Sequence, residues 1–476
     1  METASQLAGI RFNRYPSVDS SWRPTCWPAF AAGYRLTSRR ETMPSDQAAT
    51  PNTLAQPSSR ASQLQLVGVL SGLAAGAWLG AAEAPAKLVD VGLSPLLISL
   101  VMVVGVFLAR WSLPALILGT SSVRSDVRRA PHLIIWALLA GCLWAVANTL
   151  TIFAIRDIGL SLAFPLWNSN SFLGVFWGFL LFNELRQAGW RRWMGVLGGA
   201  LVMFAGATVL AMTASGGATG SYSWRGIWAA LGAGVLWGTM YIPYRKAYIT
   251  GMNPLSFVTF FTFGELAMMT ALAVSYLGFA PLWRELSGAR DVLFWLMLGG
   301  FVWVVGDLFQ QYAAKYVGIS RGIPLSNTNQ LWGLLWAIFV FRELQGHTVS
   351  VYLHVVGGSL LMILGVAAIA LSSASGAEQL RWREAASREA IRYGMDIDTI
   401  AKLMEGRQSP GRIRSSRSLG DWLLVGAATA FFAVFATMAR APRLSLDLLS
   451  AAALSAAALL LLFICGLALW RITRFN

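Results

Sequence analysis

The stretch GLSLAFPLWNSNSFLG, residues 159–174, returns in altered form as GISRGIPLSNTNQLWG, residues 318–333. Both stretches place a proline, two asparagines and a closing glycine at the same spacing. A shift of 159 positions aligns them, and the same shift carries Gly141–Gly206 onto Gly300–Gly365 without an insertion. An internal repeat of this length indicates that the fold is assembled from two related units.

The composition is that of a membrane protein. Hydrophobic residues make up 56% of the chain and charged residues 12%, whereas about a quarter of the residues in soluble domains are charged. Apolar runs of about twenty residues recur, and each is long enough to cross a hydrocarbon core about 30 Å thick. Because backbone polar groups in lipid must be paired within the span, we expect helices. The sequence therefore predicts an all-α polytopic membrane protein that resides in a lipid bilayer.

Twelve apolar runs are candidate membrane spans. Ten lie in the repeat, at 64–84, 94–119, 131–154, 160–183, 194–213, 225–244, 254–279, 292–314, 320–341 and 349–371. Two more, at 420–439 and 445–470, lie outside it. Since five spans per unit is an odd number, the second unit enters the bilayer from the opposite side. We expect a ten-helix inverted repeat (5+5) with two additional C-terminal transmembrane helices.

These spans divide the chain into five predicted segments. Residues 1–62 form a disordered cytoplasmic tail, 63–215 the first five-helix repeat and 224–373 the second. Residues 376–418 form a charged cytoplasmic linker with helical patterning around Glu378–Tyr393 and Ile397–Met404, and 419–472 hold the two extra helices.

The net charge of +15 comes largely from arginine in short loops and tails. That distribution is an orientation signal rather than a nucleic-acid-binding stripe, so we expect no nucleic-acid partner. The side richer in lysine and arginine is predicted to be cytoplasmic, with both termini inside and the protein in the plasma (inner) membrane.

Few acidic residues interrupt the apolar spans. Glu265 and Asp307 lie deepest, and their repeat counterparts are Val106 and Asn148. Charges in the membrane are costly and usually mark a water-lined path, a relay or a paired site. Glu265, Asp307 and Glu83 are therefore the candidate proton-coupling residues; the alternative is a protonated carboxyl hydrogen-bonded between helices. For Glu184 and Glu343, at span ends, a structural ion pair is predicted.

The repeated stretches are the most polar part of the apolar halves. Their amides and hydroxyls offer donors and acceptors without net charge, which suits a neutral polyol. Tryptophan and tyrosine rings can stack on a sugar, although interfacial anchoring or core packing explains most membrane tryptophans. The candidate substrate-binding residues are Trp144, Asn148, Asn168, Asn170, Tyr241, Trp303, Asn327, Asn329 and Gln330.

Motifs for catalysis are not convincing. Gly318-Ile-Ser320-Arg-Gly322 fits the nucleophile-elbow pattern by accident, because no strand precedes it and its counterpart belongs to the same repeat. Phosphate-loop and zinc patterns are missing from the sequence. No enzyme activity, cofactor or metal is expected, so any transport must be driven by gradients.

Several motifs together resemble a known family. They are the Gly80–Pro85 and Gly238–Pro243 spacings, the repeated Gly-[Leu/Ile]-Ser-x-x-x-Pro, and Phe-x-Glu-Leu at 182–185 and 341–344. Residues 64–371 resemble the drug/metabolite transporter superfamily, and 318–333 looks like its glucose/ribose porter branch of glucose-uptake and rhamnose permeases. The resemblance implies proton-coupled sugar symport by alternating access. The long N-terminal tail and residues 376–476 depart from the family pattern.

The sequence thus favours a secondary active transporter whose partners are a small sugar-like substrate and a coupling proton. Alternatives are an exporter or exchanger of another metabolite, or a membrane scaffold that recruits a partner through residues 376–476. A homodimer is one possible oligomeric state.

Overall fold

The structure is a computed structural model that describes residues 59–87, 92–212, 223–342, 344, 348–372, 374–407, 417–440 and 446–475. All of them belong to one unit, residues 55–476, while residues 1–54 lie outside the described residues. The described part contains helices and no strand, which confirms the all-helical prediction there.

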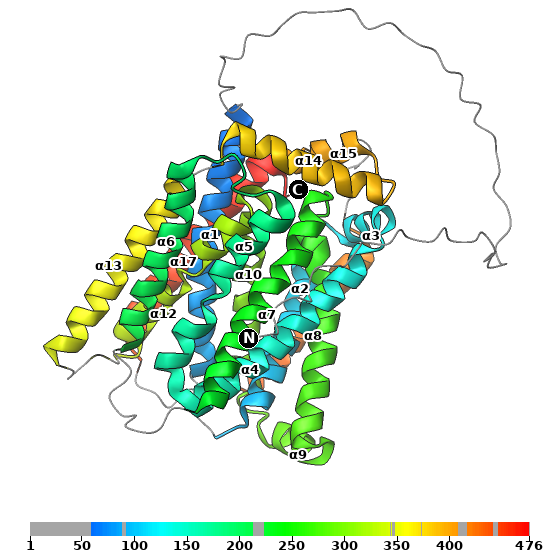
Figure 1. Cartoon of the computed structure of the whole chain (residues 1–476). Helices are drawn as coiled ribbons and strands as arrows, with labels where there is room; N and C mark the ends of the chain where they lie inside the picture. The colour runs from blue at the N-terminus through cyan, green and yellow to red at the C-terminus, as the bar shows by residue number, and fades with distance from the viewer. Residues whose placement is uncertain are drawn as a thin grey trace, which may run out of the picture. The chain divides into compact units, whose positions relative to one another are not determined.

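In chain order, the helices are grouped by the two segments that the sequence repeat suggests (Figure 1). The first half contains α1 (Ser59–Lys87), α2 (Pro95–Ile117), α3 (Thr120–Arg129), α4 (Leu133–Trp167), α5 (Asn170–Phe182) and α6 (Trp190–Ala211). The second contains α7 (Trp224–Ile249), α8 (Pro254–Leu277), α9 (Phe279–Gly288), α10 (Leu293–Val317), α11 (Ile319–Ser326), α12 (Asn329–Leu335), the π-helix η2 (Trp336–Val340) and α13 (Val349–Leu371). The C-terminal part contains α14 (Gly376–Arg392), α15 (Ile397–Met404), α16 (Leu419–Met438) and α17 (Leu448–Thr473).

Nine helices in the described part are long and apolar enough to cross a membrane, namely α1, α2, α4, α6, α8, α10, α13, α16 and α17. The predicted spans 160–183, 225–244 and 320–341 are not among them. The span 160–183 is divided between the end of α4 and the short helix α5, and the span 320–341 is divided among α11, α12 and η2. Glycine, tryptophan and tyrosine lower the mean hydropathy of α7. Many apolar helices are thus present, as a polytopic membrane protein requires.

The structure differs from the sequence prediction at two helix boundaries. The helix α1 begins at Ser59, so the predicted tail at 1–62 is too long by its last residues. The helix α4 runs without interruption through Gly159 to Trp167, although a loop was predicted between the spans 131–154 and 160–183. In the second copy the chain does break, because Gly318 has a φ of 84°, which glycine adopts readily.

Both copies interrupt their helices at an asparagine. The break between α4 and α5 lies at Asn168 and Ser169, and that between α11 and α12 at Asn327 and Thr328. These positions differ by 159, so the helix break is itself repeated. The most polar stretch of each half therefore coincides with backbone that leaves the helical ladder.

Helices of the two halves pack against each other in matching pairs. The helix α1 packs on α10, α4 packs on α7 and α8, α2 packs on α10, and α6 packs on α13. Two glycines allow the closest approaches: a Cβ at Gly141 would lie 2.1 Å from the carbonyl oxygen of Phe261, and one at Gly300 would lie 2.0 Å from that of Met102. Small residues are what allow helix backbones to meet this closely in membranes.

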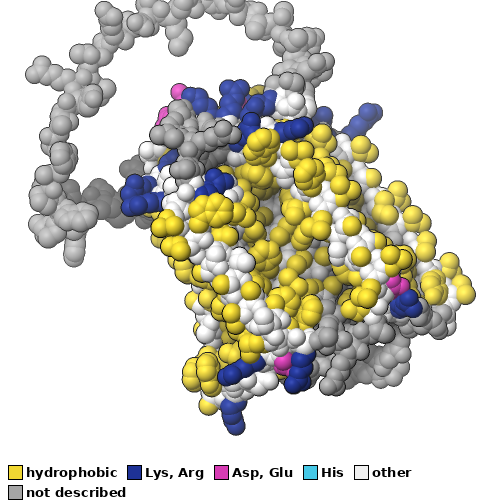
Figure 2. All heavy atoms as spheres, turned by 180° about the vertical axis from the view of Figure 1, so that it is seen from behind, with side chains coloured by type: hydrophobic (Ala, Val, Ile, Leu, Met, Phe, Trp, Pro, Cys, Tyr) yellow, Lys and Arg dark blue, Asp and Glu magenta, His cyan; other side chains and the backbone are white. Residues whose placement is uncertain are grey.

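Apolar side chains cover the flank of the helices in Figure 2, with lysine and arginine gathered at the two ends. The exposed large apolar residues include members of α13, α16 and α17, such as Leu353, Leu364, Leu423, Leu459 and Phe463. An apolar belt between charged ends is the surface that a bilayer requires.

The C-terminal helices pack on the repeat. The helix α14 contacts α7, α16 contacts α2, and α17 contacts α1. The helices α14 and α15 confirm the helical patterning predicted in 376–418. In Figure 1 they lie across one end of the long helices, and α9 lies at the other end.

Candidate functional site

The site centres on an arginine between two acids. Arg110 of α2 places Nη1 2.7 Å from Oε2 of Glu265 on α8, and Nη2 2.7 Å from Oδ2 of Asp307 on α10. The three side chains are 0–1% exposed. The two acids singled out from the sequence are therefore brought together, and a cation joins them.

Local packing explains why these residues meet. A Cβ at Gly264, next to Glu265, would lie 2.1 Å from the carbonyl oxygen of Leu138, and one at Gly105 of α2 would lie 2.1 Å from that of Met297. Glycine at both positions lets α8 settle on α4 and α2 settle on α10. The buried faces of α2, α8 and α10 then converge at the level of Arg110.

Aromatic rings and an amide surround the ions. The guanidinium of Arg110 lies 4.1 Å from the ring centre of Phe261 and 5.2 Å from that of Trp303. Trp303 packs edge-on against Trp144 at 5.3 Å between ring centres. Gln311 donates Nε2 to both carboxylate oxygens of Asp307, at 3.1 Å each. The predicted aromatic pair thus lies beside the ion cluster.

The charges of this cluster do not balance. One guanidinium faces two carboxyl groups, so the cluster carries one excess negative charge when both acids are ionised and none when one is protonated. Within the described residues, Oε1 of Glu265 and Nε of Arg110 have no hydrogen-bond partner although both are buried. An unpaired buried polar atom is costly, so the cluster has capacity for a proton or a polar ligand.

A second polar cluster lies at the helix breaks. Nδ2 of Asn327 donates to Oδ1 of Asn170 at 3.2 Å and to Oγ of Ser171 at 2.7 Å, which links the two halves. Oδ1 of Asn329 and Oε1 of Gln330 are buried and have no partner within the described residues. These atoms are acceptors that a hydroxyl group can satisfy.

Tyr241 lies near the ion cluster. Gln310 of α10 donates Nε2 to Oη of Tyr241 at 3.3 Å and to Oγ of Ser326 at 2.6 Å. Its chain neighbour Gln311 bonds Asp307. Two adjacent residues of α10 thus connect the site: Gln311 bonds Asp307, and Gln310 bonds Ser326, the last residue of α11 before the break at Asn327.

The remaining predicted residues lie in less informative places. Asn148 donates Nδ2 to Oγ of Ser99 on α2 at 3.1 Å, and Asn168 lies at the break between α4 and α5. The side chains of Glu83 and Glu343 lie outside the described residues.

Arg110 is the member of the site that the sequence analysis missed. The sequence analysis named no cationic partner for the two acids, and in the structure both pair with Arg110. The signal was available, because Arg110 is an arginine inside the predicted span 94–119. The rule that marks intramembrane acids marks intramembrane arginine equally.

A further group of buried ion pairs lies at the end where α14 crosses. Glu184 pairs with Arg245 at 2.8 Å, in line with its predicted structural role. It also accepts hydrogen bonds from the amides of Ile319 and Ser320 at 3.1 and 2.9 Å. The carboxylate of Glu184 thereby caps the start of α11.

The helix α14 is bound to the repeat by a second buried pair. Glu378 accepts Nη1 and Nη2 of Arg321 at 2.7 and 2.9 Å, and also the amide of Leu185 at 2.7 Å. Further along, the ring of His132 stacks on Tyr393 at 3.6 Å. Burial, together with nearby Lys246, lowers the pKa of His132 below its usual value, so the neutral ring is favoured in this contact.

The geometry defines a helical membrane protein with a buried ion cluster beside uncharged polar and aromatic side chains. Residues 228–400 match the profile of a family described as sugar transport protein. Two curated relatives, each described as a "Putative sugar uptake protein", come from Streptococcus pyogenes serotypes M1 and M3. Each is 33% identical over 122 residues, which is 25% of this chain and 38% of the relative.

The chain thus spans 38% of the length of these curated relatives. One solved structure aligns with a TM-score of 0.43 at 18% identity, over 66% of this chain and 98% of the other. The similarity is to sugar transport proteins, which are transporters rather than enzymes.

Proposed function

We propose that this protein is a secondary active transporter for a small neutral polar substrate, with a sugar as the substrate class. The observation that carries the proposal is the buried Arg110–Glu265–Asp307 cluster beside the Trp144–Trp303 pair. The sugar transport profile over residues 228–400 supports the substrate class.

The mechanism that we propose is alternating access between inverted halves, as in the drug/metabolite transporter superfamily. Contacts related by the repeat support it: Gly141 approaches Phe261 as Gly300 approaches Met102, and both pairs are related by the shift of 159. The packing of α4 on α7 likewise matches that of α10 on α1. Transporters with inverted repeats place substrate near the midplane, at the repeat interface and beside broken helices.

The substrate would lie between the ion cluster and the breaks at Asn168 and Asn327. Sugar hydroxyls would donate to the unpartnered oxygens of Asn329 and Gln330 and would compete for the Asn170–Asn327 bond. The faces of Trp144 and Trp303 would cover the apolar side of the ring.

Coupling would use the unequal charges of the cluster. Protonation of Glu265 or Asp307 leaves the cluster neutral, and a neutral cluster crosses an apolar interface at lower cost. Glu265 is favoured because its Oε1 has no hydrogen-bond partner among the described residues, whereas Asp307 is held by Gln311. Glu83 is the next candidate.

Uptake of a labelled sugar panel into vesicles, with and without a pH gradient, tests the proposal. If either acid carries the coupling proton, Glu265→Gln or Asp307→Asn still exchanges sugar at equal concentrations but does not accumulate it under a pH gradient. Glu384→Gln, an exposed α14 residue paired with Arg381, is the control and should accumulate sugar normally. If both cluster variants accumulate sugar under a pH gradient, the coupling assignment is contradicted. If the protein transports none of the neutral sugars in the panel, the substrate class is contradicted.

The orientation follows from the arginine bias, and we place both termini and α14 on the cytoplasmic side of the plasma (inner) membrane. Residues 376–476 would anchor or regulate the carrier without entering the substrate path, because they have no counterpart in either half.

A further inference from the structure

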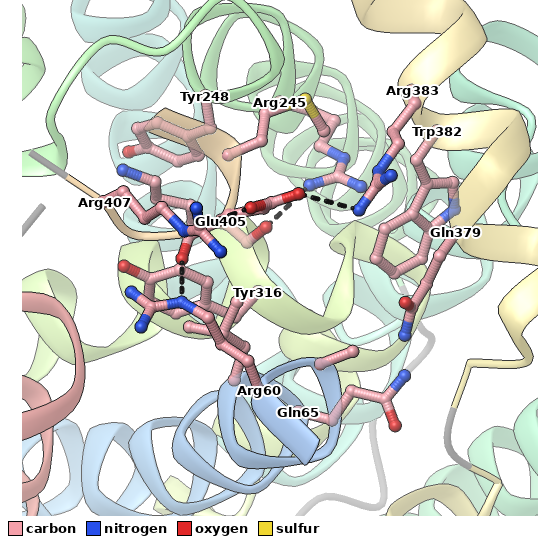
Figure 3. A pocket seen from close by; sticks show the side chains of 14 residues that line it. Arg60, Gln65, Arg245, Tyr248, Tyr316, Gln379, Trp382, Arg383, Glu405 and Arg407 are labelled. Carbon is pink, nitrogen blue, oxygen red and sulfur yellow. Dashed lines mark hydrogen bonds and ion pairs between the residues drawn. The ribbon is translucent and has the colours of Figure 1, made fainter. Parts of the chain in front are cut away.

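A cavity of about 390 Å³ lies between the repeat and the C-terminal segment (Figure 3). Its walls come from α1, α7 and α10 on one side and from α14, α15 and the residues after α15 on the other. It is separate from the Arg110 cluster, none of whose members lines it. The volume lies within the usual range for sites that hold small molecules.

The lining of this cavity is strongly cationic. Among the described residues, five basic side chains line it, namely Arg60, Arg245, Lys315, Arg383 and Arg407, with one carboxylate, that of Glu405. Figure 3 shows Arg60, Arg383 and Arg407 converging on Glu405. Arg383 and Arg407 share the Glu405 carboxylate, at 2.9 and 3.3 Å, whereas Arg60 bonds its backbone oxygen at 3.0 Å. Glu184 pairs with Arg245 from outside the lining, but the two carboxylates of Glu405 and Glu184 still do not balance the basic side chains. The cavity therefore attracts anions.

Three buried donors on the cavity wall have no partner. Nη2 of Arg245, Oη of Tyr248 and Nε1 of Trp382 make no hydrogen bond within the described residues. Arg245 and Tyr248 are 1% exposed and Trp382 is 6% exposed, so bulk water does not readily serve them. Buried polar groups without partners are uncommon and call for an explanation. Here, all three belong to side chains that line the same cationic cavity.

The other bonds of Arg245 fix the direction of its free nitrogen. Its Nε pairs with Glu184, its Nη1 donates to the carbonyls of Ala314 and Lys315 at 3.0 and 2.9 Å, and its guanidinium lies 4.7 Å from the ring centre of Trp382. Within the described residues, Nη2 is the nitrogen of Arg245 that has neither an ion-pair partner nor a hydrogen-bond acceptor, so it is left to bond a ligand. A guanidinium anchored this way is preorganised for an oxygen anion.

We propose that this cavity binds a phosphate monoester carried on a small hydroxylated skeleton. The phosphate oxygens would accept a hydrogen bond from Nη2 of Arg245. They would also replace the carboxylate of Glu405 as the partner of Arg383 and Arg407, since guanidinium groups bind phosphate in a bidentate manner. Gln379 would bond the hydroxyl groups, and the ring of Trp382 would pack on the skeleton. The ligand would join α14 to α7 and α10, so occupancy would tie the C-terminal segment to the repeat.

The same phosphate chemistry is available from a soluble sugar phosphate or from a phosphoinositide headgroup, and the experiment separates these sources. The full-length protein in lipid nanodiscs is titrated with glucose 6-phosphate, glucose and inorganic phosphate, and thermal stability and calorimetric binding are measured. Parallel nanodiscs contain phosphatidylinositol bisphosphate in place of the soluble probes. The variants are Arg383→Gln/Arg407→Gln, which removes two cations, and Gln379→Glu, which adds an opposing charge without removing an arginine. Arg381→Gln, exposed on the same helix and outside the lining, is the matched control.

We expect glucose 6-phosphate to bind saturably and raise the melting temperature, while glucose has no such effect. Affinity should fall by about tenfold or more in the double variant and in Gln379→Glu, remain in Arg381→Gln, and weaken as salt rises. Stabilisation by the phosphoinositide alone, lost in the same variants, would identify a lipid headgroup as the source. If no phosphorylated probe binds, or if all variants bind equally, the proposal is overturned. Because glucose transport is not the readout, a failed transport proposal would leave this result intact.

Discussion

At the scale of single residues, Arg110 determines whether two acids can be buried in apolar helices. Glu265 and Asp307 would repel each other without it, and neither has another basic partner among the described residues. Removal of one member from a buried ionic group leaves an uncompensated charge, whereas apolar or neutral replacement of the whole group is often tolerated. Arg110 is therefore the member whose loss should cost most.

We predict that Arg110→Met destabilises the protein by about 3–5 kcal/mol, because two buried carboxyl groups lose their cation. The triple variant Arg110→Met/Glu265→Gln/Asp307→Asn should recover most of that stability, since no charge then remains in the cluster. The free energies of unfolding of the single and triple variants are measured by denaturant titration in detergent micelles, with proteolysis as the probe of unfolding. If the single variant proves as stable as the parent, the ion cluster is not a structural requirement.

The sequence alone led to part of this site and not to the rest, for physical reasons. Glu265 and Asp307 stood out because a carboxyl group in an apolar run demands compensation, and the repeat pointed to Trp144 with Trp303. Arg110 could not be identified from the sequence as the partner of the two acids, because the face of α2 on which it lies meets them only through the packing of α2 against α8 and α10. The unpartnered atoms of Asn329 and Gln330 likewise depend on three-dimensional packing.

At the scale of elements, α14 is more than a linker. Glu378 lies in its first turn, completely buried, where it neutralises Arg321 at the start of α11 and accepts the Leu185 amide. The helix thus supplies a charge that both halves of the repeat use. A chain stopped after Ser375 should still insert and bind substrate, because 376–476 is expected to anchor or regulate the carrier outside the substrate path. It should nevertheless be less stable than the parent, because it lacks this carboxylate.

We predict that Glu378→Gln lowers stability by about 3–5 kcal/mol, because buried Arg321 then has no counter-charge. Arg321→Met/Glu378→Leu should be less harmful than Glu378→Gln, since both charges leave together. Thermal unfolding in nanodiscs provides the measurement. Arg381→Ala, which breaks an exposed pair on the same helix, should change stability by less than about 1 kcal/mol and serves as the control. Equal effects of Glu378→Gln and Arg381→Ala would rule out this role for α14.

Periodicity located most helices but not their interruptions. The runs at 94–119 and 254–279 correspond closely to α2 and α8, because each helix starts with a proline and is followed by a glycine of positive φ, Gly119 or Gly278. The continuity of α4 through Gly159 was not predictable from its counterpart, because the equivalent Gly318 has a φ of 84° between two helices, whereas Gly159 lies within α4. Identical residues at equivalent repeat positions therefore took different conformations.

At the scale of the whole chain, the repeat shift of 159 relates contacts as well as residues. The glycines of α6 and α13 give a second example: Gly199 approaches Gly365, and Gly358 approaches Gly206. The shift of 159 converts the first of these contacts into the second. Contacts that exchange in this way indicate that α6 and α13 meet about a two-fold axis. If that axis lies in the membrane plane, the halves have opposite orientation, as alternating access by inverted repeats requires.

Labelling of single cysteines tests that orientation. Ser125 lies in α3 and Ser287 in α9, which lie at opposite ends of the long helices in Figure 1. In a variant without its native cysteines, we predict that Ser125→Cys reacts with an impermeant maleimide only from the cytoplasm and that Ser287→Cys reacts only from outside. The arginines near Ser125, at 124, 128 and 129, are the reason for placing that end inside. If both cysteines react from the same side, the inverted arrangement is refuted. If Ser125→Cys reacts only from outside and Ser287→Cys only from the cytoplasm, the inversion holds but the orientation that we propose for α14 is reversed.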